Sequence, residues 1–411
     1  MTLANETTSS PSAPGLMEGV RVLDLTRQIA GPYCTKLMAT YGADVIKIEQ
    51  PGVGDPIRHL PPFYKDEPDP EGSLHFLYLN TSKRSVTLDL NTERGKQIFL
   101  DLAKTADVVV ENFRPGVMDE FGIGWETLHV LNPRLVLTSI SNFGQTGPYR
   151  DLRASDLTEY AMSGAMTISG REDLSPLKHG LSQGQYDGGV YAAWVTSMML
   201  FWQAQGRTGQ WIDVSIRDVI ASSLVLNEPF YAWMGGIQGR RTPVGDGTGN
   251  GMGDIMPCAD GYVIVQYRNG EPWENVAALL DSTELLDPMF STNELRMVTG
   301  EMLYEAMRDG LKDKKKHDLF NKGAELRVLM GIAQDPKDLL ACPHLNARGY
   351  WVDVDHPKTG KMKYPGAPIG MPGLAYTLTA APTLGQHTEE VLGELGINAT
   401  EVASLRTQNV I

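Results

Sequence analysis

Cysteine is scarce in this chain, and its few cysteines lie far apart. Cys34, Cys258 and Cys342 are the only three in 411 residues, and no two of them form a CxxC pair. An odd number of widely spaced cysteines excludes a dense disulfide framework and gives no signature of a metal site. The simplest interpretation is a chain with reduced thiols that works in the cytoplasm without a bound metal.

The glycine motifs of nucleotide cofactors are missing as well. No GxGxxG fingerprint opens the helix expected after the first strand, and no GxxxxGK loop occurs. The first motif carries the pyrophosphate of dinucleotides. A nicotinamide or flavin cofactor is therefore not expected.

Positive charge is in deficit. Only 36 Lys and Arg stand against 50 Asp and Glu, which gives a net charge of -14. Because binding to polyphosphate requires clustered Lys and Arg, a nucleic-acid partner is excluded. A local basic pocket for one small phosphorylated ligand remains compatible with this composition.

Long apolar runs are also absent. The most apolar run, residues 190–202, is too short to span a bilayer, and Thr196 and Ser197 interrupt it. No membrane partner is expected. Residues 1–15 are rich in Thr, Ser, Ala and Pro and have no apolar h-region, which predicts a flexible tail and not a signal peptide.

The chain does contain a regular alternation of strand-like and helical patterns. Helical patterns separate apolar runs at residues 19–25, 42–49, 86–90, 107–112 and 135–140. This order predicts an α/β fold with a parallel sheet covered on both faces. Ligands of such sheets bind beyond the carboxyl ends of the strands. We therefore expect the binding site in the polar loops that follow these runs.

The length predicts more than one domain, since 411 residues exceed what a single hydrophobic core usually supports. A change in composition near residue 235 and a glycine-rich loop after it mark a boundary. The predicted division is a large domain at 16–234 to which 365–411 return, a small domain at 235–350, and a linker at 351–364.

One stretch, Gly180 to Ala193, concentrates glycine ahead of a long apolar segment. It contains Gly180, Gly184, Gly188 and Gly189. Because glycine lacks a Cβ, it permits close approach to the backbone, and such a stretch favours a ligand or a reacting group. A functional site is expected there.

Ordered motifs run through nearly the whole chain. They include Val22-Leu-Asp-Leu-Thr, Gly42-Ala-Asp-Val-Ile-Lys-Ile-Glu49, Lys83-Arg-Ser85, Val110-Glu-Asn-Phe-Arg-Pro-Gly116, Gly144-Gln-Thr-Gly-Pro148 and Gly206-Arg-Thr-Gly-Gln210. With these motifs the chain resembles the family III CoA-transferases, which include formyl-CoA transferase, carnitine CoA-transferase and 2-methylacyl-CoA racemase. The resemblance implies a Rossmann-like large domain, a smaller α/β domain and two subunits interlocked like links of a chain.

The resemblance also implies that coenzyme A, carried as an acyl-CoA substrate, lies in the loops that follow the strands. Lysine and arginine there would make charge-assisted hydrogen bonds to its phosphates. The residues expected to line the adenosine and pyrophosphate, pair with a phosphate or flank the nucleotide are Arg27, Gln28, Ile29, Ala30, Lys83, Asn112, Phe113 and Arg114.

The family's nucleophile is an aspartate that attacks the acyl-CoA thioester, giving an acyl-aspartyl anhydride and then an aspartyl-CoA thioester. Counted without a gap from Gly188 and Gly189, this aspartate falls on Gln185. A carboxamide cannot act as a nucleophile. It can still hydrogen-bond a thioester oxygen.

Asp187 is a poor substitute, because two residues along a helix point to nearly opposite sides. An acidic residue in the first turn of a helix is favoured by the helix dipole in any case. Racemase chemistry is disfavoured too, since the family's racemases use a histidine at the position of Ser155 besides the aspartate. No catalytic residue is therefore expected on this chain.

Three hypotheses follow. The first, which we favour, makes the chain the non-nucleophilic subunit of a hetero-oligomeric CoA-transferase whose homologous partner supplies the aspartate. It resembles the two-subunit enzymes of anaerobic aromatic degradation, which implies an acyl donor such as succinyl-CoA and an aromatic succinate as acceptor. The second is a self-sufficient CoA-ester enzyme that uses Asp187, Glu159 or another group. The third is a CoA-ester binding protein without turnover. Tyr160, Tyr186 and Tyr191 could accommodate an aryl group, although their spacing is also typical of core packing.

Overall fold

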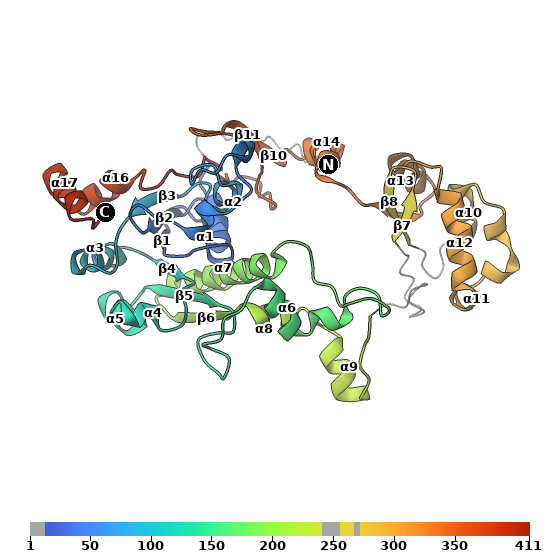
Figure 1. Cartoon of the computed structure of the whole chain (residues 1–411), viewed down its shortest axis with the longest axis horizontal. Coiled ribbons are helices and arrows are strands. Elements are labelled where there is room, and N and C mark those ends of the chain that lie inside the picture. Colours follow the sequence, from blue (N-terminus) through green and yellow to red (C-terminus); the bar gives the residue numbers. More distant parts are fainter. Residues whose placement is uncertain (1–12, 241–254, 267–271) are drawn as a thin grey trace. The chain divides into compact units, whose positions relative to one another are not determined.

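The computed structural model describes residues 13–240, 255–266 and 272–411 (Figure 1). These residues form two compact units, which we call the sheet unit and the small unit. The small unit comprises Met166–Lys178 and Leu226–Cys342. The sheet unit comprises the chain up to Ala165 together with His179–Val225 and Pro343–Ile411. It is therefore assembled from three separate segments.

A six-stranded sheet forms the centre of the sheet unit (Figure 1). Every pair of neighbouring strands in it is parallel. In the order β3-β2-β1-β4-β5-β6, the strands are Arg84–Thr87, Asp44–Glu49, Arg21–Asp24, Val108–Glu111, Val136–Ser141 and Trp211–Ser215. The predicted α/β fold with a parallel sheet is confirmed.

Alternation along β1 directs its side chains to two separate layers. Leu23 and Leu25 belong to a core shared with helices on one face. The helices of that face are α3 Glu93–Ala103, α5 Trp125–Leu131, α16 Thr388–Glu394 and α17 Ala399–Thr407. Asp24 points to the opposite face, where it accepts a hydrogen bond from Thr35 of α1, Ala30–Thr40.

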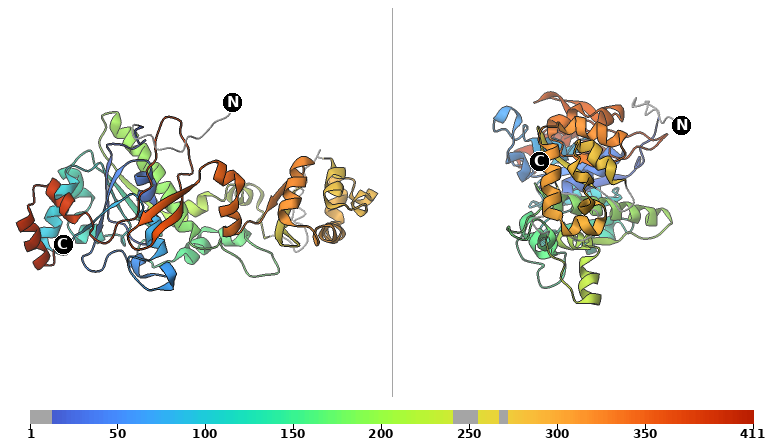
Figure 2. Two further views of the ribbon diagram at one scale, coloured as in Figure 1. Left: turned by 90° about the horizontal axis from the view of Figure 1, so that it is seen from above. Right: turned by 90° about the vertical axis from the view of Figure 1, so that its right-hand side faces the viewer.

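The long helix α7, Gln183–Ala204, covers the same face as α1. Its contact to the sheet includes a 2.8 Å hydrogen bond between Thr196 and Thr138 of β5. The left view of Figure 2 shows this helix beside the strands. The other helices of the sheet unit are α2 Leu74–Leu79, α4 Val117–Glu120, α6 Asp156–Ser163, α8 Ile216–Ser222 and α15 Pro343–Ala347.

The glycines at the start of α7 allow helices to pack closely. A Cβ on Gly189 would lie 2.5 Å from the carbonyl oxygen of Ala30 at the start of α1. A Cβ on Gly184 or Gly188 would meet isoleucine side chains of α8 at 2.7 and 2.9 Å. The close approach that the sequence predicted therefore exists, but for these three glycines the approaching groups belong to neighbouring helices and not to a ligand.

Residues 351–365 contain an antiparallel hairpin of β10 Trp351–His356 and β11 Gly360–Pro365. It covers most of the segment expected to form a linker. Val354 and Tyr364 of the hairpin are buried in a cluster with Ile57 and Phe76. The hairpin is thus packed into the sheet unit.

The small unit has its own core, around the antiparallel sheet β7 Ile255–Cys258, β8 Gly261–Gln266 and β9 Leu329–Ile332. Its helices are α9 Asn227–Met234, α10 Trp273–Leu280, α11 Asn293–Val298, α12 Gly300–Leu311, α13 Lys316–Glu325 and α14 Pro336–Ala341. Short 3-10 segments of the chain are Pro56–His59, Tyr64–Asp66, Ala165–Ile168, Glu284–Leu286 and Pro288–Phe290. Among the described helices of both units, none is long and apolar enough to cross a membrane.

Candidate functional site

Two loops meet where the strand order of the sheet reverses. The loop after β1, residues 26–30, and the loop after β4, residues 112–116, lie side by side because β1 and β4 are neighbours. Two hydrogen bonds of 2.7 Å join them, from the Arg27 N–H to Asn112 Oδ1 and from Asn112 Nδ2 to the Arg27 carbonyl. The Arg27 guanidinium also lies 4.9 Å from the centre of the Phe113 ring. The crevice at such a reversal is where open α/β sheets bind ligands.

Buried charges hold the loop after β1 in place. Gln28 has a φ of 66°, a left-handed conformation that is uncommon for a residue with a side chain. Its N–H donates to Asp55 Oδ1 at 3.0 Å, and Asp55 Oδ2 accepts from Lys47 Nζ at 3.0 Å. The same ammonium donates to the Thr26 carbonyl at 2.8 Å. The lysine and aspartate thus bind the loop at two points.

The sequence reasoning missed this support, although a signal was present. Lys47 interrupts the apolar run of β2, and its side chain is fully buried. A lysine inside a buried strand needs a counter-ion. Ile29 and Ala30 complete the loop, and Ala30 is the first residue of α1.

Lys83, for which the resemblance implies a phosphate contact, lies in a buried hydrogen-bond network. It is buried, and its ammonium donates to Asp24 Oδ2 at 2.9 Å, Asn80 Oδ1 at 2.8 Å and the Pro32 carbonyl at 3.0 Å. These acceptors use all three protons of the ammonium. In the described conformation Lys83 therefore has no proton left for a phosphate, and its expected phosphate contact stays a prediction.

The two members of this buried pair stabilise each other's charge. Burial by itself would raise the pKa of Asp24, but Lys83, Lys47 and hydrogen bonds from two threonines lower it to about 2. Burial lowers the pKa of Lys83 to about 8, against the opposing effect of Asp24. Arg114, in contrast, is exposed, so its guanidinium is accessible to a ligand. The Glu120 carboxylate lies 3.7 Å from this guanidinium.

Gln185 lies in the first turn of α7 and contacts a buried carboxylate. Its Nε2 lies 3.0 and 2.8 Å from the two oxygens of Glu159, which belongs to α6. Glu159 is fully buried. Burial raises the pKa of Glu159 to about 7, although the hydrogen bond from Gln185 opposes the rise. No sequence pattern links these residues, which are 26 positions apart.

Asp187 has different surroundings from Gln185. Its Oδ1 accepts a hydrogen bond from Gln183 Nε2 at 3.3 Å. The Gly184 N–H donates to Asp156 Oδ1 at 3.0 Å. The start of α7 is therefore surrounded by the carboxylates of Asp156, Glu159 and Asp187.

The three tyrosines considered for an aryl group do not form one site. Tyr186 packs edge-on against Tyr33, with ring centres 4.9 Å apart. The Tyr160 hydroxyl is 3.1 Å from His179 Nδ1. Tyr191 lines a separate pocket, so the sequence spacing does not bring the three rings together.

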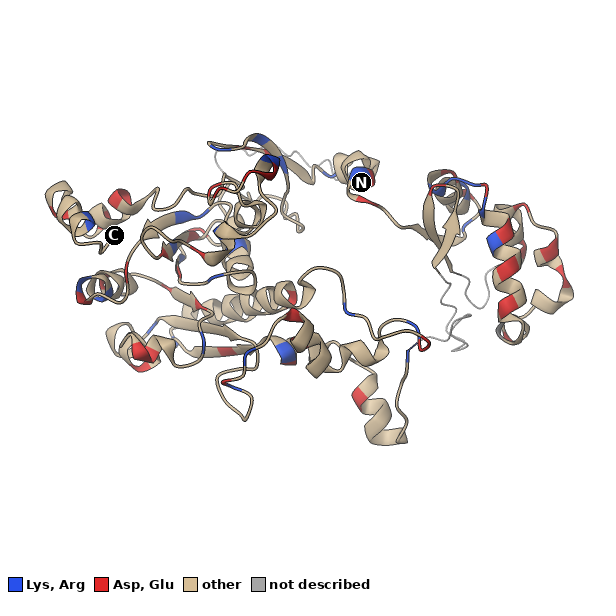
Figure 3. Cartoon of the chain, viewed as in Figure 1, with Lys and Arg blue, Asp and Glu red and all other residues tan. Residues whose placement is uncertain are grey.

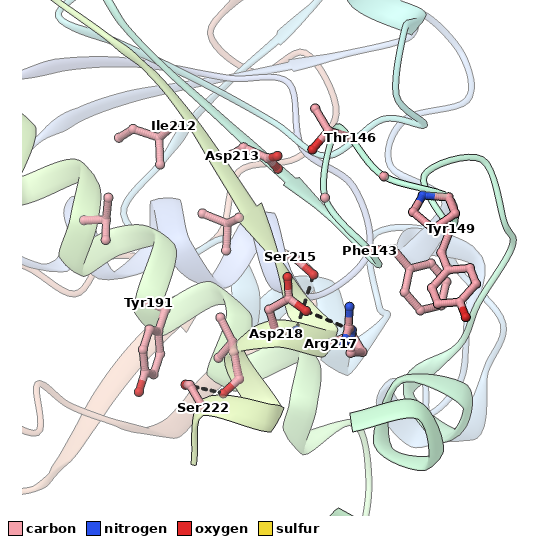
Figure 4. A pocket seen from close by; sticks show the side chains of 16 residues that line it. Phe143, Thr146, Tyr149, Tyr191, Ile212, Asp213, Ser215, Arg217, Asp218 and Ser222 are labelled. Carbon is pink, nitrogen blue, oxygen red and sulfur yellow. Dashed lines mark hydrogen bonds and ion pairs between the residues drawn. The ribbon is translucent and has the colours of Figure 1, made fainter. Parts of the chain in front are cut away.

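This pocket has a volume of about 460 Å³ and lies along β6 and the loop that follows β5 (Figure 4). Phe143, Tyr149 and Tyr191 contribute aromatic side chains to its lining. Asp213 accepts a hydrogen bond from the Gln145 N–H, and burial raises its pKa. Gln185 is not part of this lining, so the pocket is separate from the position expected for the nucleophile.

Comparison with known proteins decides the family. Residues 17–388 match the family model described as CoA-transferase family III. The chain belongs to CoA-transferase family III. The family implies acyl-CoA and carboxylic acid substrates.

Curated relatives cover almost the whole chain. It is 34% identical to the succinyl-CoA:(R)-benzylsuccinate CoA-transferase subunit BbsE of Thauera aromatica, over 94% of this chain and 95% of that protein. It is 33% identical to the formyl-CoA:oxalate CoA-transferase of Streptomyces avermitilis, over 96% of this chain and 99% of that protein. The matched residues therefore belong to both units.

Solved structures agree with this result. A CAIB/BAIF family protein from Brucella suis is 29% identical and superposes with a TM-score of 0.84, over 93% of this chain and all of that chain. A hypothetical protein from Mycobacterium tuberculosis is 25% identical with a TM-score of 0.75, over 92% of this chain and 99% of that chain. The family III fold therefore extends through the described residues.

Proposed function

We propose that this chain is the non-nucleophilic subunit of a hetero-oligomeric family III CoA-transferase. The observation that carries this proposal is the Gln185 carboxamide, which stands where the resemblance places the family's aspartate. Its amide is held by Glu159 and is neutral. A carboxamide nitrogen has a delocalised lone pair and cannot attack a thioester carbon.

The chemistry would then take place on a homologous partner. The partner's aspartate attacks the thioester carbon, the thiolate of CoA leaves, and an acyl-aspartyl anhydride forms. The thiolate returns to the aspartyl carbonyl and releases the donor acid, and the acceptor acid later takes CoA from the aspartyl thioester. On this chain, the loops carrying Arg27, Asn112 and Phe113 would hold a CoA ester beside the sheet.

A partner also accounts for the surface of α7. This helix of 22 residues carries one charged residue, Asp187, and Figure 3 shows the rest of it without charge. Trp194, Met198 and Phe201 follow at helical spacing and are 57, 53 and 70% exposed. Exposed apolar side chains on one helix face favour a protein interface. An interlocked partner would cover them.

The name of the Thauera relative suggests the substrate class, because that protein is a subunit of a transferase acting on succinyl-CoA and (R)-benzylsuccinate. We therefore extend the proposal to a donor such as succinyl-CoA and an aromatic succinate as acceptor. The raised pKa of Glu159 favours one competing function, in which Glu159 itself reacts in a self-sufficient enzyme. Its complete burial behind Gln185 is the argument against that function.

Expression of this chain alone and together with an aspartate-bearing homologue from the same source tests the proposal. The pair should co-purify and transfer CoA from succinyl-CoA to benzylsuccinate, whereas this chain alone should transfer none. Replacing the partner's aspartate by asparagine should abolish activity, and hydroxylamine trapping should modify the partner only. Robust transfer by this chain alone would overturn the proposal.

A further inference from the structure

The carboxylate of Glu159 lies buried behind Gln185. Glu159 is one of the few fully buried acidic side chains whose hydrogen-bond partner is a neutral amide and not a cation. Three other buried carboxylates near the sheet differ in this respect, whereas Glu111 of β4 accepts a hydrogen bond from the Phe113 N–H. Asp24 is paired with Lys83, Asp55 with Lys47, and Glu49 with Arg58.

The neighbours of Glu159 make further negative charge unfavourable there. The titratable groups around it on α6, on α7 and before α7 are Asp156, Tyr160, His179 and Asp187. Asp156 raises the pKa of Glu159 further. Helix α8 contributes apolar contacts from Ile216 and Ile220 to the first turns of α7. These surroundings disfavour a second negative charge beside Glu159.

A carboxylate at the position of the Gln185 amide would meet Glu159 at about 3 Å, the separation of the present hydrogen bonds. Two carboxyl groups at this distance cannot both be ionised in a buried site, so one of them keeps a proton. A free acid that binds against the Gln185 amide, which lies between it and Glu159, is repelled by the same negative charge. A neutral thioester is not.

We propose that Glu159 is a specificity-determining residue that closes the Gln185 position of this chain to carboxylates and leaves it open to the neutral thioester of a CoA ester. This inference rests on the proposed function and deepens it, since it names the ligand class of that site. Free acid substrates are then bound by the partner. The same repulsion predicts that Gln185→Asp shares a proton with Glu159 and is a weaker nucleophile than an isolated carboxylate.

Three variants of the full chain test the repulsion without relying on activity: Gln185→Asp, Glu159→Gln, and the exchange variant that combines both. The exchange variant keeps one acid and one amide but reverses their positions. A carboxyl whose pKa is raised on folding stabilises the chain below that pKa and loses this contribution as pH rises through it. The unfolding midpoint of Gln185→Asp should therefore fall by about 5 °C more than that of the exchange variant between pH 5 and pH 8.

Equal pH profiles for Gln185→Asp and the exchange variant would overturn the role of Glu159. Should Gln185→Asp not fold at either pH, direct binding decides. Calorimetry of the purified chain, with its partner where required, should show succinate binding about tenfold tighter to Glu159→Gln than to the parent at pH 8. Unchanged succinate affinity would also overturn the inference.

These outcomes are separable from those of the proposed function. Transfer by this chain alone would refute the subunit role but would leave the contrast between the two pH profiles intact. Loss of that contrast would refute the role of Glu159 and would leave the requirement for a partner untouched.

Discussion

Buried charged groups have different partners in the loops at the sheet and at the start of α7. Beneath the loops, Lys47 and Lys83 each meet an aspartate within hydrogen-bond distance. At the start of α7, a buried glutamate meets a carboxamide, and three glycines let helices approach closely. The first region is held by pairs of opposite charges, and the second by close helix packing and hydrogen bonds from a neutral amide.

This difference shows where each region tolerates change. Removing one member of a buried ion pair leaves an uncompensated charge, which costs far more than the pair itself contributes. A tightly packed helix contact instead responds to added volume. The loops should therefore be sensitive to lost charge, and the start of α7 to added atoms.

The largest effect is expected for Asp24→Asn. The change leaves the Lys83 ammonium buried without a counter-ion, and it removes the acceptor of Thr35 as well. We expect the free energy of unfolding to fall by about 3–5 kcal/mol, measured by urea denaturation. Asp101→Asn is the matched control, because Asp101 pairs with Lys104 and accepts a hydrogen bond from Gln97 at the surface. Exposed ion pairs of this kind contribute less than about 1 kcal/mol. Similar losses of unfolding free energy for both variants would show that the buried pair contributes no more than a surface pair.

The next effect is expected for Gly189→Ala. Its Cβ would lie 2.5 Å from the Ala30 carbonyl oxygen, which is backbone and cannot rotate away. Overpacking of this kind costs about 1–3 kcal/mol. Gly180→Ala is the control, since no atom lies within 4 Å of the added Cβ. If both variants unfold at the same urea concentration, the packing of α1 against α7 does not require glycine at position 189.

The smallest effect is expected for Asn112→Ala, which tests the junction of the two loops. The change removes two hydrogen bonds to the Arg27 backbone at a partly exposed position. Stability should fall by about 1 kcal/mol, and CoA-ester affinity, measured by calorimetry, should fall several-fold because the loops separate. Asn91→Ala, whose side chain bonds only its neighbour Asp89, provides the control. Unchanged CoA-ester affinity would show that the junction is not part of the binding site.

Sequence reasoning could predict the parts of this fold that follow from local periodicity. Apolar runs between helical patterns identified five strands of the sheet, although not β6. From these runs the sequence placed Arg27 and Asn112 after strands, but it did not predict the strand order that sets them side by side. It could not predict contacts fixed only by tertiary packing. The pairing of Gln185 with Glu159 joins two helices, and the pairing of Lys83 with Asp24 joins residues 59 positions apart. The glycines were correctly read as sites of close approach, but the sequence does not say whether a ligand or a helix approaches.

The segmented construction of the sheet unit affects how the chain matures during synthesis. Val410 and Ile411 are buried in the core beneath the sheet, and the Asp89 N–H donates to the Val410 carbonyl. The core therefore closes only after residues 388–411 have left the ribosome. The small unit, whose residues precede them, can fold earlier, as units often do during translation. Until these residues emerge, the side chains of the sheet that pack against them in the finished core remain uncovered.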